Sequence, residues 1–262
     1  EFVSEYADGE MFQTEGSRLA DDKAVVNCLP GNTRSYLGTN IAQITQVVQA
    51  GSLNVHALGQ SLYSRARASG VETMRGTITD IETEDGVYRL DLLSAGEQKS
   101  LRANTLILAA GPFSRQLAGY LKVDLPVKSY LQRKIVLNDP LSVIPRDMPF
   151  TIFADSQYLS WSTEEQMAFQ ADPEFCWLTE KFPAGLHIKP ESESQIKLGW
   201  AYNRIAEQAD FELYDDVSFL DVVMRGASRF IPGLAQYVGN IPTPIMQIAG
   251  YYTRTEENWP LI

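Results

Sequence analysis

The run Thr105-Leu106-Ile107-Leu108-Ala109-Ala110, followed directly by Gly111-Pro112, decides our prediction of the fold. An uninterrupted run of this length and composition is typical of a strand that is covered on both faces, as in a parallel sheet. Small residues at the end of such a strand let the backbone approach a ligand, because ligands of open α/β sheets bind at that edge. A tight turn that leaves a strand uses the same residues, so the run becomes specific only together with its neighbours.

The segment before this run predicts a helix and a small antiparallel sheet. Asn54 is the expected N-cap of the helix, and Gly70 is expected to end it. The apolar residues that recur at helical spacing are Val55, Leu58, Leu62 and Ala66. Short strands are expected at residues 71–74, 77–83 and 87–93 and again after Gly96, with a turn at Glu84-Asp85-Gly86. This order of elements indicates an α/β fold.

Residues 126–247 read as a second region, punctuated by proline and aspartate, with strand-like pieces such as residues 197–201. Ser162 followed by Glu165 has the spacing of a capping box and predicts the start of a helix. A second helix is predicted from helical spacing and ends at Pro232-Gly233; its apolar residues are Phe219, Val223, Ala227 and Phe230. The first forty residues are expected to form loops and short elements.

Composition excludes several classes of function. The 262 residues are 44% apolar, as in an ordinary globular protein, and 22 basic against 33 acidic side chains give a net charge of −11. This charge repels phosphate backbones, so we expect no nucleic-acid partner. The apolar runs are too short to cross a bilayer, and we expect no transmembrane segment. The chain begins at Glu1 and stops just after an apolar Pro260-Leu261-Ile262 run, so we expect that it is truncated at both ends.

Cysteine and histidine are rare in this chain. Cys28 and Cys176 are too far apart to predict a metal-ligand pair or a redox CxxC, and they favour a reducing, cytoplasmic setting. His56 and His187 are the only histidines, so no metal site and no Ser-His-Asp arrangement is expected. Both histidines are predicted to be structural, although His187 lies on a strand-like piece that could point toward a cofactor, and we keep it as a weak catalytic candidate.

Segments around the predicted helix and strand, and one segment at the far end of the chain, share a family pattern. The first group comprises Gly51-Ser52-Leu53-Asn54-Val55-His56-Ala57-Leu58, Gly70-Val71, Arg75-Gly76-Thr77-Ile78-Thr79-Asp80-Ile81 and residues 106–114. The far segment is Ala249-Gly250-Tyr251-Tyr252-Thr253-Arg254-Thr255-Glu256-Glu257-Asn258-Trp259-Pro260-Leu261-Ile262. Together these segments resemble the D-amino-acid oxidase, glycine oxidase and sarcosine oxidase superfamily of FAD-dependent oxidoreductases, whose carboxyl-terminal flavin loop has the same spacing of Gly, Thr, an acidic residue and Pro-x-Ile.

The resemblance implies an α/β (α+β) fold with an incomplete, Rossmann-like FAD-binding sheet of the glutathione-reductase type and an interleaved, mainly antiparallel substrate domain. The FAD-binding domain would comprise residues 40–120 and 245–262, and the substrate domain residues 1–39 and 121–244. The resemblance further implies that the backbone of Ile78 meets the adenine of FAD. The other implied cofactor contacts are Ala109, Ala110 and Gly111 at the ADP half, and Gly250 and Tyr251 at the isoalloxazine.

Two features depart from the family pattern. No GxGxxG occurs in this sequence, although the family binds the FAD pyrophosphate with that motif; a chain complete without it would hold FAD weakly. Tyr252 stands where glycine oxidase-like members carry an arginine that pairs with a substrate carboxylate, and a phenol supplies no charge. Arg254 could replace that arginine, but a solvated pair with Glu256 or Glu257 is the more ordinary role.

The resemblance implies oxidation of a C–N bond of an amine or amino acid by hydride transfer to flavin N5, with an imine as product. The implied partners are the small-molecule substrate and an electron acceptor, which is oxygen, a carrier protein or a quinone. The catalytic candidates are Tyr251, Tyr252 and Arg254, with His187 as the weak fourth. Two alternatives stay open: a dehydrogenase-type member that passes electrons to a carrier or quinone, and a non-catalytic α/β module for binding or subunit interaction.

Overall fold

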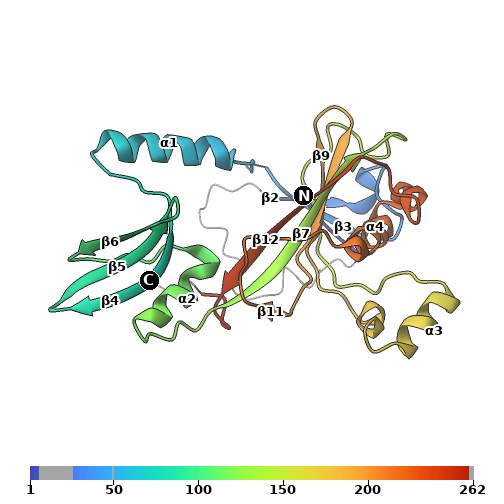
Figure 1. Cartoon of the computed structure of the whole chain (residues 1–262). Helices are drawn as coiled ribbons and strands as arrows, with labels where there is room; N and C mark the ends of the chain where they lie inside the picture. The colour runs from blue at the N-terminus through green and yellow to red at the C-terminus, as the bar shows by residue number, and fades with distance from the viewer. Residues whose placement is uncertain (6–25, 49, 260–262) are drawn as a thin grey trace. The chain divides into compact units, whose positions relative to one another are not determined.

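The computed structural model describes residues 1–5, 26–48 and 50–259 (Figure 1). The chain divides into two compact units, and each is described by itself. Unit 1 comprises Glu1–Ala50, Leu131–Arg204 and Asp210–Gly250, and unit 2 comprises Gly51–Tyr130, Ile205–Ala209 and Tyr251–Ile262. Which of the two predicted domains binds FAD stays a prediction.

The larger sheet is mixed, with the strand order β11-β7-β10-β9-β8-β1-β3-β2, and β12 pairs with β7 (Figure 1). Its strands are β1 Phe2–Ser4, β2 Val26–Pro30, β3 Gln43–Val47, β7 Lys128–Asn138, β8 Thr151–Phe153, β9 Leu186–Glu191, β10 Gln195–Trp200, β11 Ala206–Glu207 and β12 Ile245–Arg254. Strand β7 pairs with β10, β10 with β9, and β9 with β8, and all three pairs are antiparallel, whereas β1 and β8 form a parallel pair. The predicted strand near residues 197–201 is confirmed as β10.

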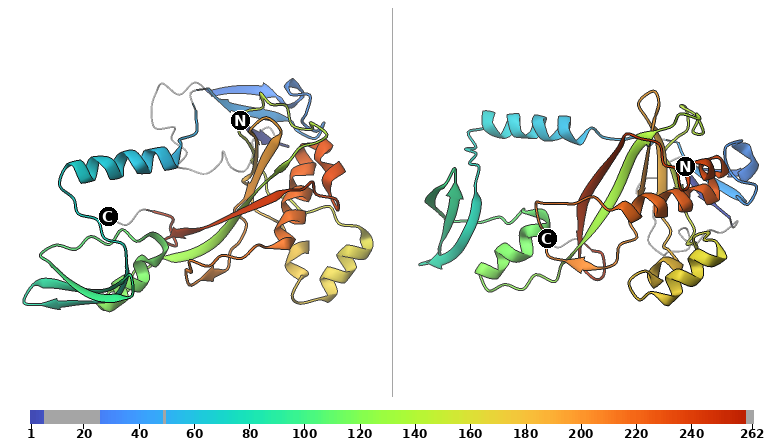
Figure 2. Two further views of the ribbon diagram at one scale, coloured as in Figure 1. Left: turned by 45° about the horizontal axis from the view of Figure 1, so that its top comes forward. Right: turned by 45° about the vertical axis from the view of Figure 1, so that its right-hand side comes forward.

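Helix α4, Val217–Phe230, packs on this sheet and supplies much of the core of unit 1 (Figure 2). The predicted apolar positions Phe219, Val223, Ala227 and Phe230 are all buried. Gly226 allows the close approach, since a Cβ there would stand 2.6 Å from side-chain atoms of both Leu186 and Trp200. The 3.6-residue period of the sequence therefore predicted both the helix and its buried face.

Helix α3, Thr163–Ala171, begins with the predicted capping box. The Ser162 hydroxyl accepts from the Glu165 backbone N–H at 3.1 Å, and a Glu165 carboxylate oxygen accepts from the Ser162 N–H at 2.7 Å. Arg225 of α4 ties this start to the core, because it donates to Glu165 at 2.8 Å and lies 4.3 Å from the centre of the Trp161 ring. The first turn of α3 is thus held from both sides.

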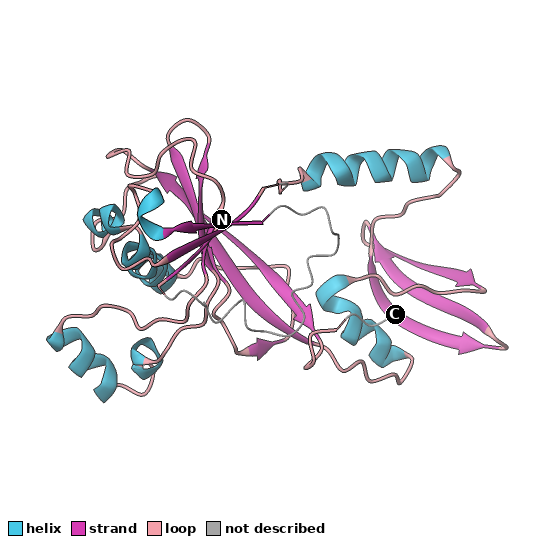
Figure 3. Ribbon diagram, turned by 180° about the vertical axis from the view of Figure 1, so that it is seen from behind, coloured by secondary structure: helices cyan, strands magenta, loops and turns pink. Residues whose placement is uncertain are grey.

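Unit 2 contains α1 Val55–Ala68, a three-stranded sheet in the order β4-β5-β6, and α2 Ser114–Tyr120 (Figure 3). The strands are β4 Thr77–Glu84, β5 Val87–Ser94 and β6 Glu97–Ala103. The predicted N-cap is confirmed, since the Asn54 side chain accepts from the Ala57 N–H at 2.9 Å. The predicted hairpin turn is also confirmed: Asp85 and Gly86 both have positive φ, at 50° and 77°, as a type I′ turn requires.

Two strand predictions are wrong. Residues 71–74 and residues 105–110 form no strand, and Ile107 is 83% exposed instead of buried. A strand exists only with a partner that accepts and donates its backbone hydrogen bonds, and no described strand pairs with either segment. The run at 105–110 therefore has the composition of a buried strand without the neighbours that would bury it.

The fold class is nevertheless confirmed. The chain is a mixed α/β protein with one large, mainly antiparallel sheet and a separate antiparallel sheet of three strands. In the described part of the chain, no helix is long and apolar enough to span a membrane.

Candidate functional site

The exposed face of β12 brings together three of the residues singled out from the sequence. Side chains alternate along a strand, and the exposed positions of β12 include Gly250, Tyr252 and Arg254. Tyr252 is 47% exposed, and no atom lies within 4 Å of the place where a Cβ on Gly250 would stand. Tyr251 points to the other, half-buried face. The strand therefore presents a phenol and a guanidinium side by side, next to backbone that a planar ligand can approach.

Arg254 is held in place by an aromatic ring. Its guanidinium lies 4.8 Å from the centre of the Tyr130 ring on β7, a cation–π contact. The ion pair with Glu256 or Glu257 does not form among the described residues. One residue earlier, the Thr253 hydroxyl is 2.9 Å from the Ser129 hydroxyl. The base of the site is thus fastened to β7, while the positive charge of Arg254 remains available to a ligand.

A compact turn follows β12. Thr255 is buried, and its hydroxyl accepts from the Trp259 N–H at 3.1 Å and also donates to the Trp259 carbonyl at 3.1 Å. Asn258 takes a left-handed conformation with φ of 58°, which asparagine tolerates better than most residues. The Pro260-Leu261-Ile262 part of the predicted flavin loop lies outside the described residues.

The Ala109-Ala110-Gly111 segment leads into a helical turn. Gly111 has a φ of +55° and begins the 3₁₀ turn Gly111–Phe113, which continues into α2. Ala109 and Gly111 are exposed, and a Cβ on Gly111 would meet no atom within 4 Å. The backbone here is open to a ligand, which fits the implied contact with the ADP half of FAD.

Ile78, the implied adenine contact, lies on β4 at a bulge. Its Cα partner is Leu92, and the register shifts between Ile78 and Asp80, which leaves Thr79 without a partner in the ladder. Because β4 is an edge strand of its sheet, one side of its backbone has no partner strand in the described part of the chain.

These residues fit the ring contacts of FAD but not its pyrophosphate. Open backbone at Gly111 and Gly250 leaves room for a flat ligand. No two glycines of the sequence are separated by a single residue, so the 262 residues contain no GxG turn for the phosphates.

His187 belongs to unit 1 and lies on β9. Its Nδ1 is 3.0 Å from the Gly185 carbonyl oxygen, which can only accept, so Nδ1 carries the proton in the neutral ring. Its Nε2 faces Gly199, where a Cβ would come within 2.5 Å. Burial lowers the pKa of His187, and the charge of Lys134 lowers it further, against the opposing hydrogen bond to Gly185. A catalytic role for this neutral histidine stays a prediction.

Trp200 belongs to the core of unit 1, and Trp177 packs against that core. Trp200 is buried and tilted against Phe182 at 5.0 Å, and Tyr202 stacks on Phe219 at 5.8 Å. Trp177 stacks on Tyr202 at 5.9 Å. The described structure therefore uses these rings for packing within unit 1.

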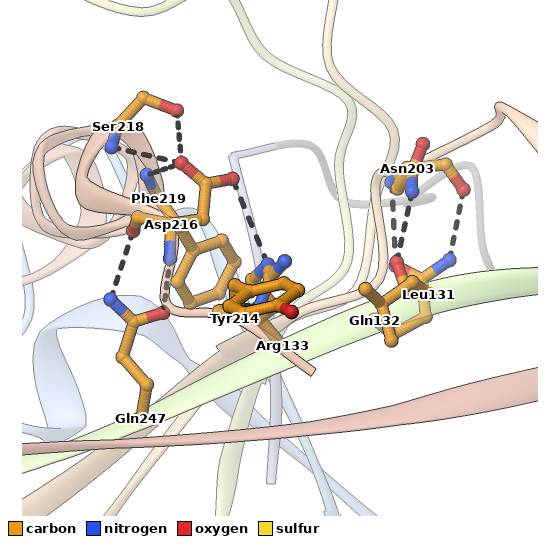
Figure 4. A network of polar contacts seen from close by, with 9 residues as sticks. All are labelled: Leu131, Gln132, Arg133, Asn203, Tyr214, Asp216, Ser218, Phe219 and Gln247. Carbon is orange, nitrogen blue, oxygen red and sulfur yellow. Dashed lines mark hydrogen bonds and ion pairs between the residues drawn. The ribbon is translucent and has the colours of Figure 1, made fainter. Parts of the chain in front are cut away.

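A polar network that the sequence did not reveal holds β12 against α4 (Figure 4). Gln247 of β12 accepts from the Asp216 N–H at 3.0 Å and donates to the Asp216 carbonyl at 2.9 Å. The Asp216 carboxylate caps α4 by accepting from the N–H groups of Ser218 and Phe219, and it lies 3.7 Å from the Arg133 Nε. An aspartate directly before an apolar helix is a sequence signal for an N-cap, whereas the hydrogen bonds of Gln247 can be recognised only in the tertiary structure.

Comparison with known proteins gives a family match and several structural relatives. The model of the family described as "DAO: FAD dependent oxidoreductase" matches residues 41–260. A comparison with curated protein sequences finds no match.

Three solved structures share the fold. Glycine oxidase from Geobacillus kaustophilus aligns with a TM-score of 0.59 at 14% identity, over 91% of this chain and 54% of that one. Glycine oxidase from Bacillus cereus aligns with a TM-score of 0.61 at 11% identity, over 98% of this chain and 61% of that one. Iminodiacetate oxidase from Chelativorans aligns with a TM-score of 0.57 at 17% identity, over 88% of this chain and 52% of that one. The chain thus spans between half and two thirds of the length of these relatives.

Proposed function

Because this chain belongs to the family of FAD-dependent oxidoreductases, we propose that it takes part in the oxidation of a C–N bond of an amine or amino acid. The names of its structural neighbours, two glycine oxidases and an iminodiacetate oxidase, support this substrate class. The observation that carries the proposal is the exposed face of β12, which holds Gly250, Tyr252 and Arg254 within the matched segment.

When bound, FAD would supply the electron-accepting chemistry for hydride transfer from the carbon next to the substrate nitrogen to flavin N5, with an imine that water hydrolyses as the product. Gly250 and Tyr251 would hold the ring, and Ile78, Ala109, Ala110 and Gly111 would contact the ADP half. Tyr252 would donate one hydrogen bond to the substrate. Arg254 would pair with a substrate carboxylate or with negative charge that grows in the transition state.

The chain's own residues would otherwise position the substrate. Removing water from around an amine lowers its pKa, which keeps the nitrogen unprotonated and able to release a hydride from the neighbouring carbon. No base among Tyr251, Tyr252, Arg254 and His187 is required for that step. We assign the electron acceptor only as oxygen, a carrier protein or a quinone. A cytoplasmic, reducing setting is part of the proposal, on the ground that Cys28 and Cys176 are free thiols.

A non-catalytic binding module is the less favoured reading, since the family is one of oxidoreductases. The coding sequence upstream of Glu1 discriminates between the oxidoreductase and the binding module. A GxGxxG encoded within about fifty residues before Glu1, with an acidic residue about twenty positions later, is the expected finding for the enzyme. An in-frame start codon directly before Glu1 would favour the module.

The test of the proposal is the visible spectrum of the protein made from the whole reading frame that contains these residues. We expect flavin bands at about 370 and 450 nm that bleach when glycine or an N-methylated amine is added without oxygen. Arg254→Gln should raise KM for a carboxylate-bearing amine by about tenfold or more with a smaller change in kcat, while Tyr252→Phe should have a smaller effect.

Glu97→Gln, an exposed change on β6, serves as the control and should leave both constants unchanged. A colourless protein that takes up no FAD would overturn the proposal. If Arg254→Gln behaves like Glu97→Gln while the flavin still bleaches, the proposed oxidation is supported and the proposed role of Arg254 is refuted.

A further inference from the structure

Tyr130 of β7 lies against the guanidinium of Arg254, the charged group of the candidate site. The Arg254 Cζ stands over the Tyr130 ring, 4.8 Å from its centre. Both residues belong to unit 2, so the contact lies within one compact unit. Tyr130 is half-buried and Arg254 is exposed. The ring is therefore the better fixed of the two groups, and the guanidinium is the one that needs orienting.

Neighbouring contacts fix the backbone on both sides of this pair. Tyr130 is paired with Ala206 of β11 in an antiparallel ladder. The residues directly before the two partners, Ser129 and Thr253, are joined through their hydroxyl groups at 2.9 Å. Tyr130 and Arg254 thus start from backbone positions that are held together. The remaining freedom is the rotation of the Arg254 side chain, which the binding of a ligand must restrict.

A ring against the face of a guanidinium leaves its hydrogen bonds free. The five N–H groups of arginine lie in the plane of the guanidinium and point outward from its edges. A carboxylate accepts two of them in the same plane, as a bidentate pair. Tyr130 uses none of these donors, because the cation–π attraction needs only the ring. The contact therefore orients Arg254 without competing with a carboxylate.

We propose that Tyr130 is a positioning residue that makes the site prefer amines that carry a carboxylate over amines that lack one. The ring holds the guanidinium of Arg254 with its N–H edges free before the substrate arrives, so less rotamer freedom is lost on binding. Tyr130 touches no reacting atom in this role. The proposal rests on the proposed function, in which Arg254 pairs with a substrate carboxylate.

The test compares sarcosine with dimethylamine, two amines that differ only by the carboxylate, as substrates of the protein made from the whole reading frame. Tyr130→Leu should lower kcat/KM for sarcosine by about threefold or more, mainly through a higher KM, and should leave dimethylamine unchanged. Tyr130→Phe should behave like the unaltered protein, because the ring face remains. In an Arg254→Gln background, Tyr130→Leu should have no further effect.

Tyr63→Leu on α1 is the matched control. It removes the contact of Arg67 with the Tyr63 ring, 5.9 Å from Cζ to the ring centre, and should change kcat/KM for neither amine. A merely structural Tyr130 would lower kcat/KM for both amines alike, and would do so in the Arg254→Gln background as well. Either result overturns the proposal, as does a Tyr130→Leu protein that discriminates between the two amines as well as the unaltered protein.

Acetate binding separates this proposal from the proposed oxidation, because it requires no turnover. With ¹⁵N-labelled arginine, the Nε–H resonance of Arg254 is identified by its absence from the spectrum of Arg254→Gln. Acetate should move this resonance, and Tyr130→Leu should weaken acetate binding by about threefold or more. If no amine bleaches the flavin but acetate behaves as expected, the oxidation is refuted and the role of Tyr130 is supported. An acetate response that Tyr130→Leu leaves unchanged refutes that role even where amines are oxidised.

Discussion

At the scale of single residues, the same amino acid serves different ends according to its surroundings. Asp139 is a buried carboxylate whose oxygens accept from the N–H groups of Val143 and Ile144, from the Tyr237 hydroxyl and from Arg146, so it is fully paired. Asp216 caps a helix, and Asp124 lies exposed beside Arg115. Burial and the number of partners, not residue type, separate a structural aspartate from one that is free to bind.

His187 gives a prediction at this scale. Burial lowers its pKa from the ordinary 6.5, so the folded protein keeps the ring neutral where the unfolded chain already takes up a proton. The free energy of unfolding should therefore fall as the pH drops below about 6.5, by at most about 1.4 kcal/mol per pH unit. Urea denaturation between about pH 5 and 7.5 measures it, in the range where histidine ordinarily titrates. His187→Gln should flatten this dependence relative to the exposed His56→Gln control, and equal slopes would refute the assignment.

At the scale of elements, β12 is the strand on which the proposed chemistry depends, and its position is set by α4 through Gln247. Gln247→Ala removes both hydrogen bonds to the Asp216 backbone and should cost about 1–3 kcal/mol in the free energy of unfolding. Asp216→Ala removes the N-cap and should cost about 1 kcal/mol.

Because the two residues touch, the double variant should depart from additivity by at least about 0.5 kcal/mol. Chemical denaturation of the single and double variants measures this coupling. Gln98→Ala on β6, which is exposed, should change the free energy of unfolding little. Strict additivity would mean that the Gln247 bridge and the Asp216 cap stabilise the protein independently of each other.

At the scale of the whole molecule, the core is unevenly distributed between the units. Helices α1 and α4 each span 14 residues, yet α4 buries seven of them and α1 buries none. The buried apolar side chains of unit 2, among the described residues, are Ile81, Leu92 and Ala118. Unit 1 thus supplies most of the hydrophobic stabilisation.

This contrast predicts that mutations in α1 and α4 destabilise the protein by very different amounts. Leu58→Gln and Leu62→Gln on α1 change side chains that are 47% and 54% exposed, so each should cost no more than about 0.5 kcal/mol. Met224→Ala on α4 empties a fully buried position and should cost about 2–5 kcal/mol. Thermal and chemical denaturation compare the three. A cost for the α1 leucines comparable to that of Met224→Ala would show that α1 packs against apolar surface in solution.

The sequence by itself determined the local elements. Helical periodicity and capping residues specified α1, α3 and α4, and the Asp85-Gly86 turn specified the β4-β5 hairpin, because these depend on neighbours within a few positions. The family followed from short motifs near residues 51–58 and 249–262, which the match over residues 41–260 supports. Whether the candidate residues perform the proposed chemistry stays a prediction.

Only the tertiary structure decided what each element packs against. Residues 105–110 have the composition of a buried strand, but pairing requires a second strand, and none of the described strands supplies it. The Gln247 bridge and the contact of Arg254 with Tyr130 join residues 31 and 124 positions apart, so no local pattern could reveal them. Periodicity encodes a residue's own strand or helix, whereas its partners are encoded by the fold as a whole.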